Sequence, residues 1–86
     1  MADEDLRALL SQLHARLGRA SSVDEGSRKL LATVSADIEG ALVRSEQADP
    51  GHGPLLEQLA ARFETDHPQL ATVLRQIVDT LAKAGI

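Results

Sequence analysis

Residues 70–81, L-A-T-V-L-R-Q-I-V-D-T-L, decide the fold class because their apolar residues recur with the period of an α-helix. The larger apolar side chains are three or four residues apart, so they share one face of a helix. They are Leu70, Val73, Leu74, Ile77, Val78 and Leu81. Polar residues such as Arg75 and Asp79 fall on the opposite face. We therefore predict an amphipathic C-terminal helix that buries one face.

Three further segments upstream carry the same helical spacing of apolar residues. Their apolar stripes are Leu6, Leu9, Leu10, Leu13 and Leu17 in the first, Leu30, Leu31, Val34, Ile38, Ala41 and Leu42 in the second, and Leu55, Leu56, Leu59 and Phe63 in the third. Asp24 is a good N-cap, so we expect the second helix to run from about residue 24 to 45. Pairs of opposite charge four residues apart, Asp24 with Arg28 and Glu25 with Lys29, support this helix. The sequence predicts an all-α protein, a small bundle of about four helices in a single domain spanning residues 1–86.

The connections between these segments predict how the helices follow one another. Residues 20–23 form a short link, so the two longer N-terminal helices should form an antiparallel hairpin. Residues 45–54, S-E-Q-A-D-P-G-H-G-P, hold two prolines and two glycines and no periodic apolar residue. We expect a flexible loop at about residues 46–53, after which Pro54 suits the first turn of a short third helix.

Composition excludes several classes of function. The chain has 9 Lys and Arg against 13 Asp and Glu, a net charge of -4, and Phe63 is its only aromatic residue. Neither feature suits nucleic-acid binding, which needs positive charge and stacking side chains. No apolar run approaches the roughly 18 residues that a membrane span needs. The acidic N-terminus does not resemble a secretory signal, so we expect a cytoplasmic protein that binds neither membrane nor nucleic acid.

Residues 64–70, E-T-D-H-P-Q-L, contain His67, the best candidate in the chain for a catalytic base or a metal ligand. Two structural interpretations also account for this stretch. Asp66 could cap the last helix, with Gln69 reaching back to it as in a capping box. Alternatively, His67 is itself the N-cap and Pro68 the first helical residue. Both alternatives place the break between the third and fourth helices here, because the residue before a proline avoids the α region.

No other pattern indicates an active site or a metal site. The chain has no cysteine, and its three histidines do not show the spacing of a zinc site. His14 lies beside the first apolar stripe, and His52 lies in the expected loop. Acids near helix starts and cations such as Arg16 and Arg19 near helix ends are typical of helix-dipole pairing. We predict a protein that is not an enzyme and has no cofactor and no metal.

Three parts of the chain resemble a known family. They are L-R-A-L-L-S-Q-L-H-A-R-L near the start, A-D-I-E in the second helix, and A-A-R-F-E-T-D-H-P-Q-L-A-T-V-L-R-Q-I-V-D-T-L-A-K-A-G-I at the end. The chain resembles the short bacterial proteins of domain of unknown function family 4404, most specifically in F-E-x-x-H-P-x-L and the terminal G-I. Members often carry Met where this chain has Ala84. The resemblance implies a small, all-helical bacterial protein and implies no activity.

The resemblance draws attention to one local group of residues around the last helix start. We predict that these residues form a structural or interface cluster, which consists of Phe63, Asp66, His67, Pro68, Leu70 and Ile86. In this interpretation Phe63 packs beneath the turn and His67 holds the end of the preceding helix.

The small number of large apolar side chains suggests that the chain self-associates. Of the residues that make up the 43% apolar fraction, 13 are alanine, which leaves little bulk for a core. We therefore predict a non-enzymatic interaction or self-associating module, most simply a homodimer whose apolar stripes merge. One alternative is an adaptor that binds a partner's amphipathic helix in a groove. Another is a small metal- or ligand-binding protein that uses His67 with Glu64 or Asp66.

Overall fold

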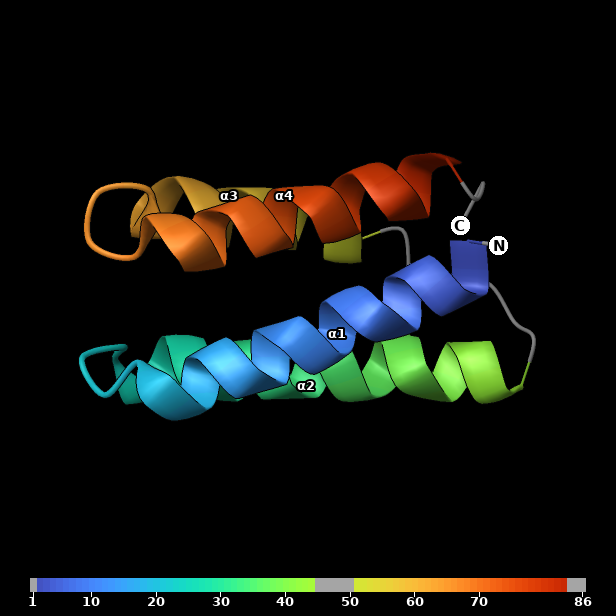
Figure 1. Cartoon of the computed structure of the whole chain (residues 1–86), viewed down its shortest axis with the longest axis horizontal. Helices are drawn as coiled ribbons and strands as arrows, with labels where there is room; N and C mark the ends of the chain where they lie inside the picture. Colours follow the sequence, from blue (N-terminus) through green and yellow to red (C-terminus); the bar gives the residue numbers. More distant parts are fainter. Residues whose placement is uncertain (1, 45–50, 84–86) are drawn as a thin grey trace.

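The computed structural model describes residues 2–44 and 51–83. These residues form four α-helices, α1 (Ala2–Arg19), α2 (Glu25–Val43), α3 (His52–Phe63) and α4 (Pro68–Lys83). Each helix contacts the next one along the chain, and α4 also contacts α1, so the four close into an antiparallel bundle (Figure 1). The α1–α2 hairpin lies beside the α3–α4 hairpin, and α1 and α4 share the face turned to the viewer. The all-α prediction is confirmed.

The apolar stripes point inwards and cover one another. The core consists of Leu6, Leu10, Leu13, Leu17, Val23, Leu31, Val34, Ile38, Ala41, Leu42, Leu56, Leu59, Ala60, Phe63, Leu70, Ala71, Val73, Leu74, Ile77 and Leu81. Because a single chain buries these side chains, the need to cover apolar stripes gives no reason for a dimer.

Leu30 departs from the predicted stripe of α2. Its side chain is 43% exposed, whereas its neighbour Leu31 is fully buried. Successive residues are separated by about 100° around a helix, so a core centred on Leu31 turns Leu30 outwards. Ser27 and Ser35 lie on the buried side of α2 instead. Ser27 stays hydrogen-bonded there, since Arg62 Nη1 lies 3.3 Å from its hydroxyl oxygen.

The start of α2 is held by a cap and by an arginine that reaches back to α1. Asp24 is the N-cap as predicted, because its carboxylate accepts a hydrogen bond of 3.0 Å from the Ser27 backbone N–H. Among the described side chains, however, Arg28 does not pair with Asp24. It donates instead to the carbonyl oxygens of Leu17 at 2.7 Å and Ala20 at 2.5 Å. Cationic side chains can hydrogen-bond the last carbonyls of a helix, so Arg28 closes α1 and ties it to α2.

The third helix begins earlier than predicted. It starts at His52, and Leu55 N–H bonds to the Gly51 carbonyl at 3.3 Å. Pro54 therefore lies inside the first turn, where a missing N–H breaks no helical hydrogen bond. Of the expected loop at 46–53, residues 46–50 lie outside the described residues, and residues 52 and 53 are helical. The His52 side chain is largely buried, at 12% exposed, and its Nε2 lies 3.5 Å from Asp37 Oδ2 on α2.

Arg75 fastens α4 to α3. Its Nη2 lies 3.3 Å from Glu64 Oε2, and its Nε lies 3.5 Å from Glu57 Oε1. The hydrogen bond and the charge of Glu64 raise the pKa of Arg75 above its ordinary value, with a smaller contribution from Glu57. This pairing fixes the α3–α4 turn on which the candidate site depends.

Candidate functional site

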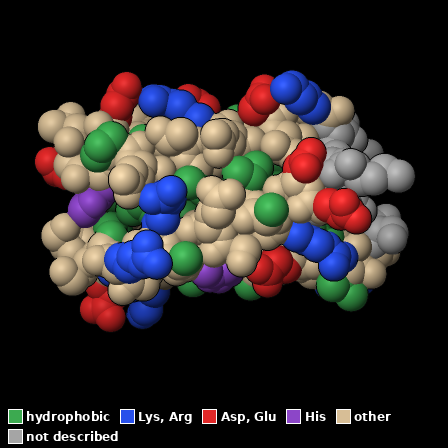
Figure 2. Space-filling view, in the orientation of Figure 1, with side chains coloured by type: hydrophobic (Ala, Val, Ile, Leu, Met, Phe, Trp, Pro, Cys, Tyr) green, Lys and Arg blue, Asp and Glu red, His purple; other side chains and the backbone are tan. Residues whose placement is uncertain are grey.

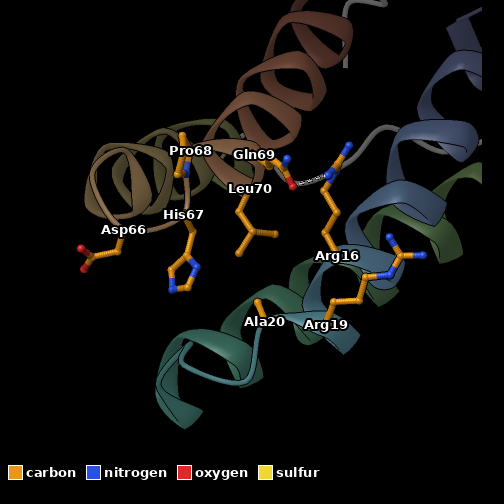
Figure 3. A pocket seen from close by; sticks show the side chains of 8 residues that line it. All are labelled: Arg16, Arg19, Ala20, Asp66, His67, Pro68, Gln69 and Leu70. Carbon is orange, nitrogen blue, oxygen red and sulfur yellow. Dashed lines mark hydrogen bonds between the residues drawn. The ribbon is translucent and has the colours of Figure 1, made fainter.

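A cleft of about 370 Å³ lies where the end of α1 meets the start of α4 (Figure 3). The end of α1 and the start of α4 lie at the same end of the bundle because the two helices are antiparallel neighbours. The lining residues are Arg16, Arg19 and Ala20 from the end of α1, and Asp66, His67, Pro68, Gln69 and Leu70 from the start of α4.

His67 is the residue that precedes α4, and Pro68 is the first helical residue. The Ala71 N–H bonds to the His67 carbonyl at 3.1 Å, which is the first hydrogen bond of the helix. The second of the two sequence interpretations is therefore correct. The capping box of Asp66 and Gln69 is not formed, because Gln69 Oε1 instead accepts a hydrogen bond of 2.7 Å from Arg16 Nη1 (dashed line in Figure 3). This bond bridges α4 and α1 across the cleft.

The imidazole of His67 joins two turns of the bundle. It meets the Phe63 ring edge to face, with centroids 5.8 Å apart and an interplanar angle of 81°. Its Nε2 lies 3.2 Å from the Ser22 hydroxyl on the α1–α2 turn. The His67 N–H also donates to the Phe63 carbonyl at 2.7 Å, which continues the end of α3 into the turn.

The residues of the predicted cluster have different surroundings. Phe63 and Leu70 are core residues, and Pro68 opens α4. Asp66 is exposed, and its carboxylate points away from the cleft (Figure 3). The cluster residue Ile86 lies outside the described residues.

Two arginines in the lining, Arg16 and Arg19, give the cleft positive charge. The sequence alone did not identify them as binding residues. Arg16 is partly buried, and its Nε is enclosed without a hydrogen-bond partner. Arg19 is exposed in the last turn of α1. Leu70 points into the space between α4 and α1 and gives the cleft an apolar floor (Figure 3). Two arginines and an apolar side chain thus line one cleft, a combination that suits a carboxylate attached to an aliphatic segment.

The contact of Ser22 with His67 raises the question of a serine nucleophile with a histidine base. Such a pair needs a third group that orients the base. Asp66, the adjacent acid, points away from the imidazole in Figure 3, and no hydrogen bond links the two within the described part of the chain. The contact therefore acts as a tie between the α1–α2 and α3–α4 turns.

The histidines are dispersed over the bundle. His14 Nε2 lies 3.4 Å from Glu39 Oε1, so this histidine links α1 to α2, whereas His52 approaches Asp37 and His67 approaches Ser22. Within residues 2–44 and 51–83, no three of the acids and histidines come together in a group that could hold a metal ion. The sequence suggested His67 with Glu64 or Asp66 for such a site, and no group of three that includes them is found among the described residues. None of the helices formed by these residues is long and apolar enough to cross a bilayer.

The match to a known protein family covers almost the whole bundle. The model of the family described as Domain of unknown function (DUF4404) matches residues 6–86. The cleft therefore lies entirely within the matched region. No match was found among curated proteins or among solved structures.

Proposed function

The chain belongs to the DUF4404 family, whose description carries no activity, and we propose that it is a non-enzymatic interaction module. In this proposal the cleft between α1 and α4 docks an acidic segment of a protein partner. The observation that carries it is that Arg16, Arg19 and the apolar side chain of Leu70 line the same cleft.

Charge and shape favour a carboxylate on a peptide over a larger polyanion. A guanidinium group presents a planar fork of donors that matches a carboxylate. Asp66 at the rim adds a negative charge that disfavours densely charged ligands, and the whole chain has a net charge of -4. Leu70 and Ala20 in the lining favour an apolar residue next to the acidic one. The ligand class is therefore an Asp- or Glu-containing segment with an adjacent aliphatic side chain.

The test compares two matched peptides by isothermal titration calorimetry at low ionic strength. One is an acetylated, amidated Asp-Glu-Asp-Leu peptide, and the other is its uncharged Asn-Gln-Asn-Leu counterpart. We expect the acidic peptide alone to bind. Equal binding of both peptides, or of neither, would contradict the proposal.

A variant and its control locate the binding at the cleft. Arg19→Gln should weaken binding of the acidic peptide by up to about fivefold, because an exposed ion pair contributes roughly 0.2–1 kcal/mol. Arg7→Gln removes the same charge from the same helix but outside the cleft, so it should leave the affinity unchanged. Equal weakening by both variants would point to nonspecific charge attraction and would argue against a site.

A further inference from the structure

A second cleft, also of about 370 Å³, lies between α1 and α4 toward their other ends. Its charged lining residues are Asp5 on α1 and Asp79 on α4, and Gln12 and Gln76 also face it. Lys83 offsets part of this charge, since its Nζ lies 3.0 Å from Asp79 Oδ2. The α1–α4 seam thus carries an acidic cleft near one end and a basic cleft near the other.

The two clefts lie on one face of the molecule. Asp5, Gln12, Arg16 and Arg19 are spaced by seven, four and three residues, which is the spacing of a single stripe along a helix. Figure 2 looks onto this face, where acidic and basic side chains are interspersed with uncharged ones. Among the described residues, the exposed large hydrophobic side chains are Leu30 and Val43, and both lie on α2, so a partner for the α1–α4 face has to complement a charge pattern.

We propose that the partner is a second copy of this chain, paired face to face so that α1 runs antiparallel to the α1 of the other copy. This inference rests on the proposed function and names the source of the acidic segment. A two-fold axis through Gln12, which lies midway between Asp5 and Arg19, places Arg19 of each copy opposite Asp5 of the other. The acidic end of one copy then supplies the carboxylate that the basic cleft of the other copy takes.

Symmetry and charge select this arrangement over its parallel alternative. Homodimers most often close with a two-fold axis, so that each contact occurs twice. A parallel pair would set Arg19 against Arg19 and Asp5 against Asp5, which is repulsive at both ends. The α1 stripe is therefore complementary to itself in one orientation only.

The size of this face and the nature of its contacts determine how tightly the two copies should bind. The Cα atoms extend over 34 × 20 × 18 Å, so the long face is close to the roughly 800 Å² per partner of a standard interface. Its contacts are polar and exposed, and salt screens such contacts. We expect a weak dimer whose dissociation constant rises with salt concentration.

The first experiment uses the absence of cysteine from the chain. A Gln12→Cys variant should form a disulfide-linked dimer under mild oxidation, since a disulfide needs Cβ atoms about 3.5–4.5 Å apart and residue 12 lies at the axis. A Thr33→Cys variant carries its cysteine at an exposed position on α2, away from this face, and should remain largely monomeric. Equal cross-linking of both variants, or none of the Gln12→Cys protein, would overturn the proposed arrangement.

The second experiment separates this inference from the proposed function. Sedimentation velocity at low salt should show a concentration-dependent dimer for the wild-type protein, and Arg19→Glu should raise its dissociation constant at least about tenfold. A wild-type protein that stays monomeric at hundreds of micromolar but binds the Asp-Glu-Asp-Leu peptide would refute the second copy as partner and leave the proposed function standing. A protein that neither dimerises nor binds the peptide would refute both.

Discussion

At the scale of single residues, side chains that are neighbours in the sequence can have very different surroundings. Leu30 and Leu31 are neighbours on α2, yet Leu31 is fully buried and Leu30 is 43% exposed. His67 and Asp66 are neighbours in the α3–α4 turn, yet one joins two turns and the other is exposed. Neighbouring residues of this kind provide matched controls for measurements of stability.

Leu31→Ala should lower the free energy of unfolding by about 2–5 kcal/mol, because truncation of a buried leucine leaves a cavity. Leu30→Ala should change it by no more than about 0.5 kcal/mol, as expected for a substitution at the surface. Urea unfolding of the two variants checks this difference. Similar losses from both would mean that α2 is turned differently around its axis.

Asp24 links stability to pH through the N-cap of α2. Hydrogen bonding to the Ser27 N–H lowers the pKa of Asp24 below its ordinary value of 3.8. The charged carboxylate therefore stabilises the folded state fully above that ordinary value, and this contribution disappears as the pH falls through the lower pKa of the folded state. Asp24→Ala should lower Tm by a few degrees at pH 7 and by less at pH 2–3. A loss of Tm that is the same at both pH values would argue against the charged cap.

His67→Ala should lower the free energy of unfolding by about 1 kcal/mol, because it removes the edge-to-face contact with Phe63 and the contact with Ser22. His14→Ala is the control, since that histidine is half exposed and lies 3.4 Å from the equally exposed Glu39. Thermal unfolding followed by circular dichroism compares the two. An unchanged Tm for His67→Ala would exclude a structural role of the imidazole.

At the scale of the helices, the sequence predicted the number and inward faces of the helices but not how their ends meet. Apolar spacing and the Asp24 cap are local signals, so α1, α2 and α4 lie close to where they were expected. The start of α3 was misplaced because Pro54 suits any position in a first turn. The cleft was missed because it depends on Arg16 meeting Gln69 across the bundle, 53 residues apart in the chain. Helical periodicity carries no information about such a meeting of ends.

Arg28 holds the α1–α2 hairpin through the carbonyls of Leu17 and Ala20. Arg28→Met keeps most of the aliphatic stem but loses both charged hydrogen bonds, so it should lower the free energy of unfolding by about 1.5–3 kcal/mol. Lys29→Met changes an exposed neighbour and should leave stability nearly unchanged. Chemical denaturation measures both, and equal stability of the two variants would show that Arg28 does not hold the hairpin.

At the scale of the whole molecule, a single chain closes its own core, which leaves polar surface for recognition. The bulk of the apolar side chains is buried inside the bundle, although 13 apolar residues are only alanine. The sequence-based expectation of a dimer relied on uncovered apolar stripes, and these stripes are covered. The proposed pairing depends instead on the opposite charges at the two ends of the α1–α4 face. It therefore predicts association that weakens with salt, whereas apolar burial would strengthen with it.

The most direct test of this account is sedimentation velocity on a mixture of two charge-reversed variants, Arg19→Glu and Asp5→Lys. Each variant alone should be monomeric, because the introduced charge faces a like charge in the antiparallel pair. Mixed in equal amounts at low salt, they should form a heterodimer in which the introduced glutamate and lysine face each other and the native Asp5 and Arg19 remain paired. A mixture that sediments as monomer, or variants that each still dimerise like the wild-type protein, would contradict the account.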